Sequence, residues 1–447
     1  MSERNRRVRV GGWLVLGLAL LAASPAGAAD RVTRPDPGLE PRVPVGRCLS
    51  AGGTLLAHER AGRAWETVGA KETVRSRDLL LALPGTQASL ETQPGSVRVK
   101  LWGNLPEEST FPGLESSAVL HDSRAFDLDL TLVTGRVVLS NKREKGEAKV
   151  WLRLPEEGWQ LALDPGSEVA LELYGRWPRG VPFRKEPGAQ EGPTQVLVLV
   201  VLKGQLDLKT PSYEHSLSAP PGPAYFHWDN VGGEAGPRRL DRLPPWADPK
   251  APPPEDARDV AEVVRAYRER LKDRGPSAAL LDLLARGERE TDKGRGRLTR
   301  EFAVLGLAAL DDVVRVAEAL ADERYADVRD TAVMALRHWI GKGRGHDREL
   351  YERLMTRQLG YTKGQAEILV QLLHSPFAAN QPETYEVLLA YLRHGKLAIR
   401  ELALWHLTRL APAGRDIRYD PAGPEAERKK AAAEWDKVLR EREKKER

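Results

Sequence analysis

A proline-rich stretch divides this chain into two parts with different hydrophobic periods, and this division constrains the fold more than any other feature. The stretch "LPPWADPKAPPPED", Leu243–Asp256, has six prolines in fourteen residues. Proline fixes φ and has no N–H to donate, so neither a helix nor a central strand continues through it. We therefore expect a stiff, extended linker over residues 244–256 that joins two independently folding parts.

Before the linker, apolar residues alternate with polar ones. In "FDLDLTLVTGRVVLS", Leu128, Leu130 and Leu132 share one face, and this period of two is typical of half-buried strands. The same alternation occurs in "VWLRL", "WQLAL", "EVALELYG" and "QLDLKT", with turn-forming segments between them. We expect residues 70–243 to form an antiparallel β-sandwich-like domain, after an N-terminal lead-in segment of residues 30–69.

Two glycines interrupt this strand pattern at matching positions. Gly135 lies in the pattern LxxGxVxL of residues 132–139, and Gly204 in VxxGxLxL of residues 201–208, which predicts a bend between strand halves. With "VRSRDLLLALPGTQASLETQPGSVRVKLWGNL" and "ALDPGSEVALELYG", these patterns resemble FecR-type extracytoplasmic domains over roughly residues 70–235. The resemblance implies a periplasmic interaction module that relays signals to membrane partners and has no catalytic residues.

After the linker the period becomes helical. From Arg329, Ala332 lies at i+3 and Leu336 at i+7, so the three share one helix face. Three more segments repeat this pattern of a basic, a small and a large apolar residue: Arg300, Ala303 and Leu307; Lys363, Ala366 and Val370; Arg400, Ala403 and Leu407. The basic positions lie 29, 34 and 37 residues apart, and helix pairs recurring at such intervals predict a short α-solenoid over residues 257–420.

The segment "LADERYADVRDTAVMAL" resembles the HEAT-repeat family. The resemblance implies stacked antiparallel helix pairs with a protein-binding concave face. It also implies that Asp322 and Arg329 meet charged residues of neighbouring units; the first and fourth units lack a matching aspartate, so no continuous charge ladder is expected. Asp327 is predicted to cap its helix, and Thr362 with Gln365 to form a capping box. Residues 421–447 are expected to form a charged C-terminal capping helix.

The first 29 residues have the layout of a secretory signal peptide: four arginines, an apolar run from Trp13 to Ala23, and small residues before Asp30. We predict export to the periplasm or exterior, with an uncleaved N-terminal membrane anchor as the alternative and no transmembrane segment after cleavage. These residues account for +3 of the net charge of +5, so the remainder gives no electrostatic case for nucleic-acid binding. The single cysteine, Cys48, is interpreted as a buried structural thiol.

A search for catalytic motifs finds none. The nine histidines form no metal-binding motif, and the glycines of Gly341–Gly345 indicate a helix end rather than a phosphate loop. Strand carboxylates such as Asp127, Asp129, Glu168 and Glu172 are interpreted as solvated. We therefore predict a non-enzymatic interaction protein, without cofactor or metal, that binds a protein of the cell envelope.

Two alternatives to this prediction stay open. Seven of the eleven tryptophans lie in the β part or at its edge: Trp65, Trp102, Trp151, Trp159, Trp177, Trp228 and Trp246. Exposed aromatic rings on a sandwich bind sugars in many proteins, so a glycan-binding protein or carbohydrate-active accessory is the first alternative, although core or interdomain packing is favoured for these rings. The second is an enzyme whose site is assembled without linear motifs.

Overall fold

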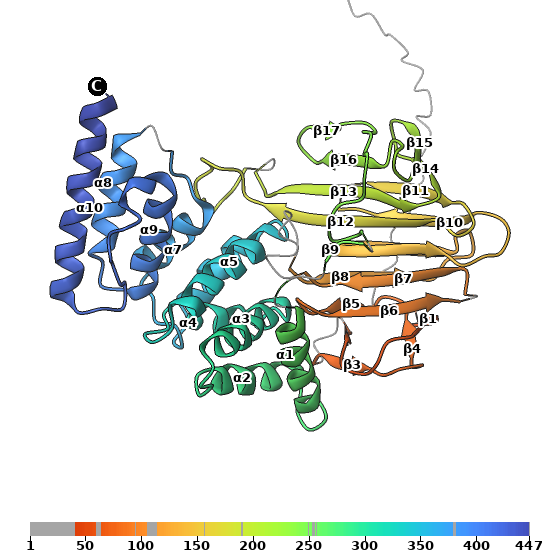
Figure 1. The fold of residues 1–447 in the computed structure, drawn as a ribbon, viewed down its shortest axis with the longest axis horizontal. Helices are drawn as coiled ribbons and strands as arrows, with labels where there is room; N and C mark the ends of the chain where they lie inside the picture. Colours follow the sequence, from red (N-terminus) through yellow and green to blue (C-terminus); the bar gives the residue numbers. More distant parts are fainter. Residues whose placement is uncertain are drawn as a thin grey trace, which may run out of the picture. The chain divides into compact units, whose positions relative to one another are not determined.

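The computed structural model describes residues 41–59, 64–93, 95–104, 114–155, 157–188, 191–248, 250–252, 255, 257–378 and 381–446. The chain divides into two compact units, Met1–Pro41 and Arg42–Arg447. The predicted signal peptide lies outside the described residues. The second unit contains a β part followed by a helical part (Figure 1), which confirms the β-then-α fold class.

Two sheets form the β part and share one long strand, β9 (Leu128–Asn141). The first sheet has the order β4-β1-β6-β7-β9-β12-β13-β16-β17, and the second has β3-β2-β5-β8-β9-β10-β11-β14-β15. All these pairings are antiparallel except β9 with β10, which is parallel. The other strands are β1 (Pro44–Cys48), β2 (Leu55–His58), β3 (Glu66–Val68), β4 (Thr73–Arg75), β5 (Leu79–Ala82), β6 (Gln87–Thr92), β7 (Val97–Trp102), β8 (Ser116–His121), β10 (Ala148–Arg153), β11 (Gly158–Leu163), β12 (Glu168–Arg176), β13 (Thr194–Lys203), β14 (Gln205–Lys209), β15 (Glu214–Ser218), β16 (Tyr225–Asp229) and β17 (Gly233–Glu234).

The two glycines that interrupt the strand pattern mark the places where the chain changes sheet. Gly135 has a φ of +83°, and β9 pairs in the second sheet before it and in the first sheet after it. Gly204 has a φ of +73° between β13 of the first sheet and β14 of the second. A left-handed φ reverses the side-chain phase at little cost only for glycine, so the predicted bend is confirmed at both positions.

The segment expected as a lead-in supplies strands to both sheets. β1 pairs with β4 and β6, and β2 pairs with β3 and β5. Cys48 ends β1 and is fully buried, as predicted. The short strands escaped the sequence analysis because three to five residues are too few to display a period of two.

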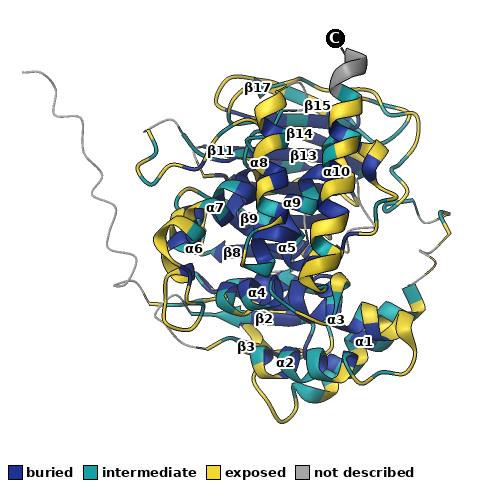
Figure 2. Cartoon of the chain, turned by 90° about the vertical axis from the view of Figure 1, so that its left-hand side faces the viewer, coloured by how far each residue is buried: buried dark blue, intermediate teal, exposed yellow. Residues whose placement is uncertain are grey.

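The helical part consists of paired helices. The helices are α1 (Ala257–Arg270), α2 (Pro276–Gly287), α3 (Lys293–Ala309), α4 (Val313–Ala319), α5 (Ala326–Gly341), α6 (His346–Leu354), α7 (Lys363–His374), α8 (Pro382–Leu392), α9 (Leu397–Leu410) and α10 (Glu425–Glu446), with a 3-10 turn η1 (Pro412–Gly414) before the last. The four repeat segments lie in α3, α5, α7 and α9, and Ala303, Ala332, Ala366 and Ala403 are fully buried. Figure 2 shows that α5 and α9 are mostly buried, whereas α8 and α10 expose their outer faces. Trp435 packs against Gly414 and anchors α10.

The two predicted caps have different outcomes. Thr362 and Gln365 form the capping box at the start of α7, as predicted. Asp327 does not cap α5, because the helix begins at Ala326 and its N-cap is Tyr325. The Asp327 carboxylate instead accepts hydrogen bonds from Arg300 on α3, so it links two repeat units rather than one helix to its own turn.

The β part and the helical part share one hydrophobic core, which differs from the expectation of two independent parts. Leu56 of β2 and Leu81 of β5 belong to the same buried cluster as Phe302 and Leu336 of the helices. Trp65 Nε1 donates to the Leu310 carbonyl oxygen across the boundary. The linker does not hold the parts away from each other, because helices cover Leu56 and Leu81 on the face of β2 and β5 that points away from the sandwich core.

Helix α5 ends against strand β12 in a close backbone contact. A Cβ atom on Gly341 would overlap the Gly175 carbonyl oxygen, and one on Gly175 would overlap the Gly341 carbonyl oxygen. Gln195 Nε2 donates to the Gly341 and Lys342 carbonyl oxygens at 3.2 and 3.3 Å, and Trp177 Nε1 donates to the Ile340 carbonyl oxygen at 3.1 Å. The last backbone carbonyls of α5 have no partner within the helix, and they accept hydrogen bonds from the β part instead.

Two carboxylates interpreted as solvated are in fact shielded. Asp129 is 5% exposed and pairs with Arg153 at 2.6 Å. Glu172 is 4% exposed and pairs with the fully buried Arg136, over which the indole of Trp246 lies at 3.7 Å. Alternation correctly assigns Glu172 to the outer face of the sheet, but it does not reveal that the linker tryptophan folds back over that face.

None of the helices among the described residues is long and apolar enough to cross a membrane.

Candidate binding groove

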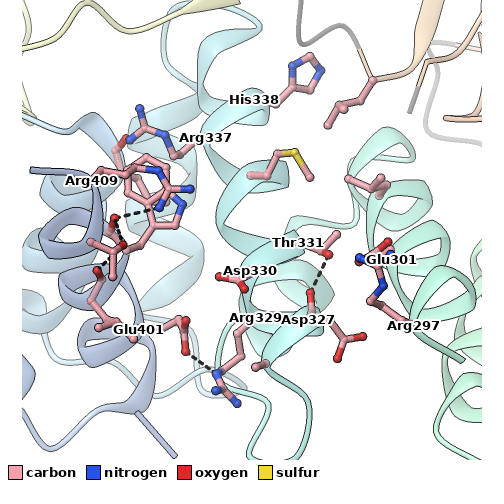
Figure 3. A pocket seen from close by; sticks show the side chains of 18 of the residues that line it. Arg297, Glu301, Asp327, Arg329, Asp330, Thr331, Arg337, His338, Glu401 and Arg409 are labelled. Atoms are coloured by element: carbon pink, nitrogen blue, oxygen red, sulfur yellow. Dashed lines mark hydrogen bonds and ion pairs between the residues drawn. The ribbon is translucent and has the colours of Figure 1, made fainter. Parts of the chain in front are cut away.

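The inner helices α3, α5 and α9 line a groove with a volume of about 1160 Å³. Gly175, Arg176 and Trp177, at the end of β12, line it as well, so both parts of the chain contribute to its wall. Phe302 and Leu305 of α3, Met334 of α5 and Leu404 of α9 give it an apolar lining. Charged side chains surround this lining: Figure 3 shows Arg337 and Arg409 close together, Arg329 and Glu401 below them, and Arg297 and Glu301 on the opposite wall. We call this hollow the α3–α5–α9 groove.

One end of the groove is held by buried ion pairs between repeat units. Arg300 Nη2 lies 2.8 Å from Asp327 Oδ2, and Arg329 pairs with Glu401 of α9. Arg329 Nη2 also lies 3.4 Å from Asp420 Oδ1. Burial raises the pKa of Glu401, and the Arg329 charge opposes that rise. The acidic groups at this end are therefore mostly matched by arginines.

The opposite end is cationic. Arg337 of α5 and Arg409 of α9 both lie over the indole of Trp405, with guanidinium carbons 4.7 and 3.7 Å from the ring centroid. Arg337 Nη1 donates to the Leu373 carbonyl oxygen at 2.5 Å, and Arg409 Nη1 to the Trp405 carbonyl oxygen at 2.9 Å. We call Arg337, Trp405 and Arg409 the cationic end.

The electrostatics of this end differ from those of the other. Burial, together with the nearby positive charges of Arg409 and Arg179, lowers the pKa of Arg337 to about 10. Within the part of the chain that the structure describes, no carboxylate forms an ion pair with Arg337 or Arg409. Asp330 acts on Arg409 only from beyond ion-pair distance. Among the described residues, neither guanidinium group therefore has a carboxylate in direct contact.

Beside the groove, a buried ion triad fixes α5 to the β part. Glu115, just before β8, lies 3.0 Å from His338 Nε2 and 2.6 Å from Lys342 Nζ. Burial alone would raise the pKa of Glu115, but Lys342 and His338 outweigh it and hold the pKa far below its ordinary range. Burial lowers the pKa of Lys342, whereas Glu115 and Asp311 raise it above its ordinary value. Glu115 therefore bridges His338 and Lys342, the two basic side chains of α5 and its C-cap.

The structure places the sequence-predicted repeat residues in two roles. The small and large apolar positions Ala303, Leu307, Ala332, Leu336, Ala366, Ala403 and Leu407 are buried in the helical core. Arg329 lines the groove, while Arg400 donates to the carbonyl oxygens of Pro421, His394 and Gly395 instead of to a carboxylate. The Asp322 carboxylate accepts from the amides of Arg324 and Tyr325, and Arg329 reaches only its backbone carbonyl. Arg329 thus meets a charged residue of another unit, Glu401, whereas the Asp322 carboxylate binds amides of its own turn.

The sequence analysis missed the cationic end. Trp405 and Arg409 are four residues apart, a spacing that puts both on one helix face and could have directed attention to them. Arg337 lies on a different helix, and no local pattern connects it with α9. The triad was missed for the same reason, because Glu115 and His338 are 223 residues apart in the chain.

The tryptophans of the β part mostly serve packing. Trp159 and Trp228 lie in the sandwich core, Trp65 and Trp177 contact the helical part, and Trp102 packs edge-on against Trp246. Trp151 differs, because it is half-buried on the outer face of the second sheet and lies 5.5 Å from Phe126. The structure contains no group of three or more His, Cys, Asp or Glu side chains suited to a metal ion among the residues that it describes.

The comparisons with known proteins give no relative: no family model, no curated protein and no solved structure matches this chain.

Proposed function

We propose that this is an exported, non-enzymatic interaction protein whose α3–α5–α9 groove binds a protein of the cell envelope. The observation that supports this proposal is the groove itself. It is large enough for a peptide segment, it has an apolar middle, and it contains two guanidinium groups without a carboxylate partner among the described residues. The groove is lined by the helices that resemble HEAT repeats, and the FecR-like β part would serve as the sensor or docking module.

Site-specific photo-crosslinking in the native cell envelope tests this proposal. A photo-reactive amino acid in place of Met334, which lines the groove, should capture a discrete protein partner. The matched control carries the same reagent in place of Val387, which is 39% exposed on α8 and does not line the groove. Capture at both positions alike, or at neither, would show that the groove is not the binding surface.

Export is the second part of the proposal, and the N-terminus of the mature protein tests it. The charged start, short apolar run and small residues favour cleavage near Ala28 or Ala29. Sequencing the N-terminus of the protein isolated from the periplasm or medium should locate that cleavage. A protein that starts at Met1 and stays with the membrane would favour the anchored alternative, and one in the cytosol would contradict export.

A second candidate function, glycan binding, is favoured by one specific observation. A hollow of about 390 Å³ on the outer face of the second sheet is lined by Phe126 and by polar side chains: Lys149, Gln160, Asp207, Lys209, Glu214, His215 and Ser216. Trp151 packs on Phe126 beside it. Binding to a glycan array that Trp151→Ala abolishes, and that Tyr225→Ala on the other sheet leaves intact, would support this function. If the protein binds no glycan on the array, glycan binding is contradicted.

A further inference from the structure

We propose that the cationic end of the α3–α5–α9 groove binds a carboxylate from an acidic segment of the protein partner. This inference rests on the proposed function and specifies the chemistry of the partner. It follows from three observations: the balance of charges in the groove, the desolvation of one arginine, and the geometry of the two guanidinium groups.

The first observation is that most of the other arginines at or beside the groove are already paired with a carboxylate. Arg300 has Asp327, Arg329 has Glu401 and Asp420, and Arg297 has Glu301. Arg337 and Arg409 have only carbonyl oxygens and an indole within hydrogen-bond or stacking distance. An incoming anion therefore finds two donors that are not already bound to a carboxylate.

The second observation is that Arg337 is poorly solvated. Its side chain is enclosed by the Trp405 indole and by α7 through the Leu373 carbonyl, and burial lowers its pKa to about 10. A desolvated cation has lost water that an anion would replace, so a carboxylate gains more there than at an exposed arginine. The neighbouring positive charge of Arg409 adds to this preference for an anion.

The third observation is geometric. Guanidinium groups present parallel N–H donors that match the two oxygens of a carboxylate, and stacking on an indole restricts how they turn. Arg337 and Arg409 approach the same ring from different helices, so the ring holds two donor sets near one another (Figure 3). Such a fixed pair can bind one carboxylate at a lower cost in side-chain entropy than two free arginines.

The distribution of charge also gives the bound segment a direction. Asp420, with a side chain that is 64% exposed, lines the groove beside Arg329, at the end held by the ion pairs. A second carboxylate placed there would meet like charge. The partner segment should therefore be acidic where it meets Trp405 and neutral or basic toward Asp420.

The test begins with the partner captured at Met334. The crosslinked segment is mapped, synthesised as a fluorescent peptide, and titrated against the exported full chain. Replacing its acidic residue by the amide (Glu→Gln or Asp→Asn) should weaken binding by about tenfold or more, as for other desolvated charge pairs. A peptide with an amidated C-terminus distinguishes a side-chain carboxylate from a terminal one. If the chain binds the C-terminal carboxylate, amidation lowers the affinity of the peptide; if it binds a side-chain carboxylate, amidation leaves the affinity unchanged.

Two variants of the chain locate the effect. Arg409→Gln should lower the affinity for the acidic peptide by about tenfold and leave the affinity for the amide peptide unchanged. Arg297→Gln, on the opposite wall of the groove, should change the affinity for either peptide by less than about twofold. Arg409 is exposed, so its loss should not unfold the protein, and equal melting temperatures check this. If acidic and amide peptides bind equally to the wild type, the inference is wrong while the proposed function stands. If Met334 captures no partner, both fail.

Discussion

Three ionisable side chains meet where α5 ends against the β part, and two of them are basic. Glu115 is 2% exposed, so its charge is compensated by His338 and Lys342 rather than by water. Arg329 and Glu401 form a second pair of this kind, with side chains 3% and 6% exposed. Removing one member of a buried pair leaves an unpaired charge in a poorly solvated site, which costs far more than loss of a surface ion pair.

Glu115→Gln should reduce the free energy of unfolding by about 3–5 kcal/mol, because Lys342 would then be buried without its main counter-charge. Urea denaturation of the full chain measures this loss. Asp311→Asn is the matched control, since Asp311 also pairs with Lys342 but has a side chain that is 55% exposed, and it should cost about 1 kcal/mol or less. Equal losses for both variants would contradict the burial argument.

Acidification should destabilise the wild type more steeply than the Glu115→Gln variant. The pKa of Glu115 in the folded protein lies far below its ordinary value of 4.5, so the unfolded chain takes up the proton first as the pH falls. The stability that this carboxylate contributes is therefore present above about pH 5 and decreases progressively below it. Urea midpoints between pH 6 and pH 3 test this, and parallel curves for the two proteins would contradict it.

Arg329→Ala should cost more than Ala332→Leu. The arginine is buried against Glu401, so its loss should lower the free energy of unfolding by about 3–5 kcal/mol, whereas overpacking the fully buried Ala332 should cost about 1–3 kcal/mol. Replacing both members of the pair, Arg329→Met with Glu401→Leu, should recover most of the loss. A double variant less stable than Arg329→Ala would show that the pair is not the source of the cost.

At the scale of elements, local pattern predicts what each element is, but not what covers it. Alternation predicts β9 to β12 and β14, and the positions of Gly135 and Gly204 predict where the chain leaves a sheet, because each depends on neighbours in sequence. β13 is apolar on both faces, and its outer valines Val196, Val198 and Val200 pack against Leu240. The sequence of β13 alone does not show that Leu240 covers this face. Trp246 over Arg136 and Asp327 beside Arg300 are further contacts of this kind.

The junction of α5 with β12 makes a prediction at this scale. Gly341→Ala should destabilise the protein by about 1–3 kcal/mol, because the new methyl group would overlap the Gly175 carbonyl oxygen and force the helix away from the strand. Gly364→Ala is the control: this glycine is also helical, but a methyl group there meets nothing, so alanine should be neutral or stabilising. Thermal unfolding of the two variants compares them, and similar shifts would indicate that helix propensity alone is measured.

At the scale of the whole molecule, the shared core makes the β part and the helical part depend on each other. The helical part alone would expose the apolar surface that Leu56, Leu81 and Leu114 cover. The core of each part could be predicted separately from the sequence, but the joining of the two cores could not. The proline-rich segment shows where one part of the chain ends, and it does not show whether the two parts pack against each other.

Expression of residues 257–447 without the β part should therefore give a protein that aggregates or lacks a cooperative transition, while the full chain should unfold in a single transition. Circular dichroism and calorimetry of both proteins measure this. Two separate transitions in the full chain, with the helical one unchanged in the isolated fragment, would restore the picture of two independent parts.

Arg176, the last residue of strand β12, and Trp177, which follows it, line the groove, and β12 hydrogen-bonds to the middle strands of its sheet. Thermodynamic linkage follows from this continuity. A ligand that occupies the groove selects the folded state of the sheet as well as that of the helices, and at a concentration of 100 times Kd it adds about 2.7 kcal/mol to the stability of the whole unit. Slowed amide exchange in β9, none of whose residues lines the groove, would then report that the groove is filled.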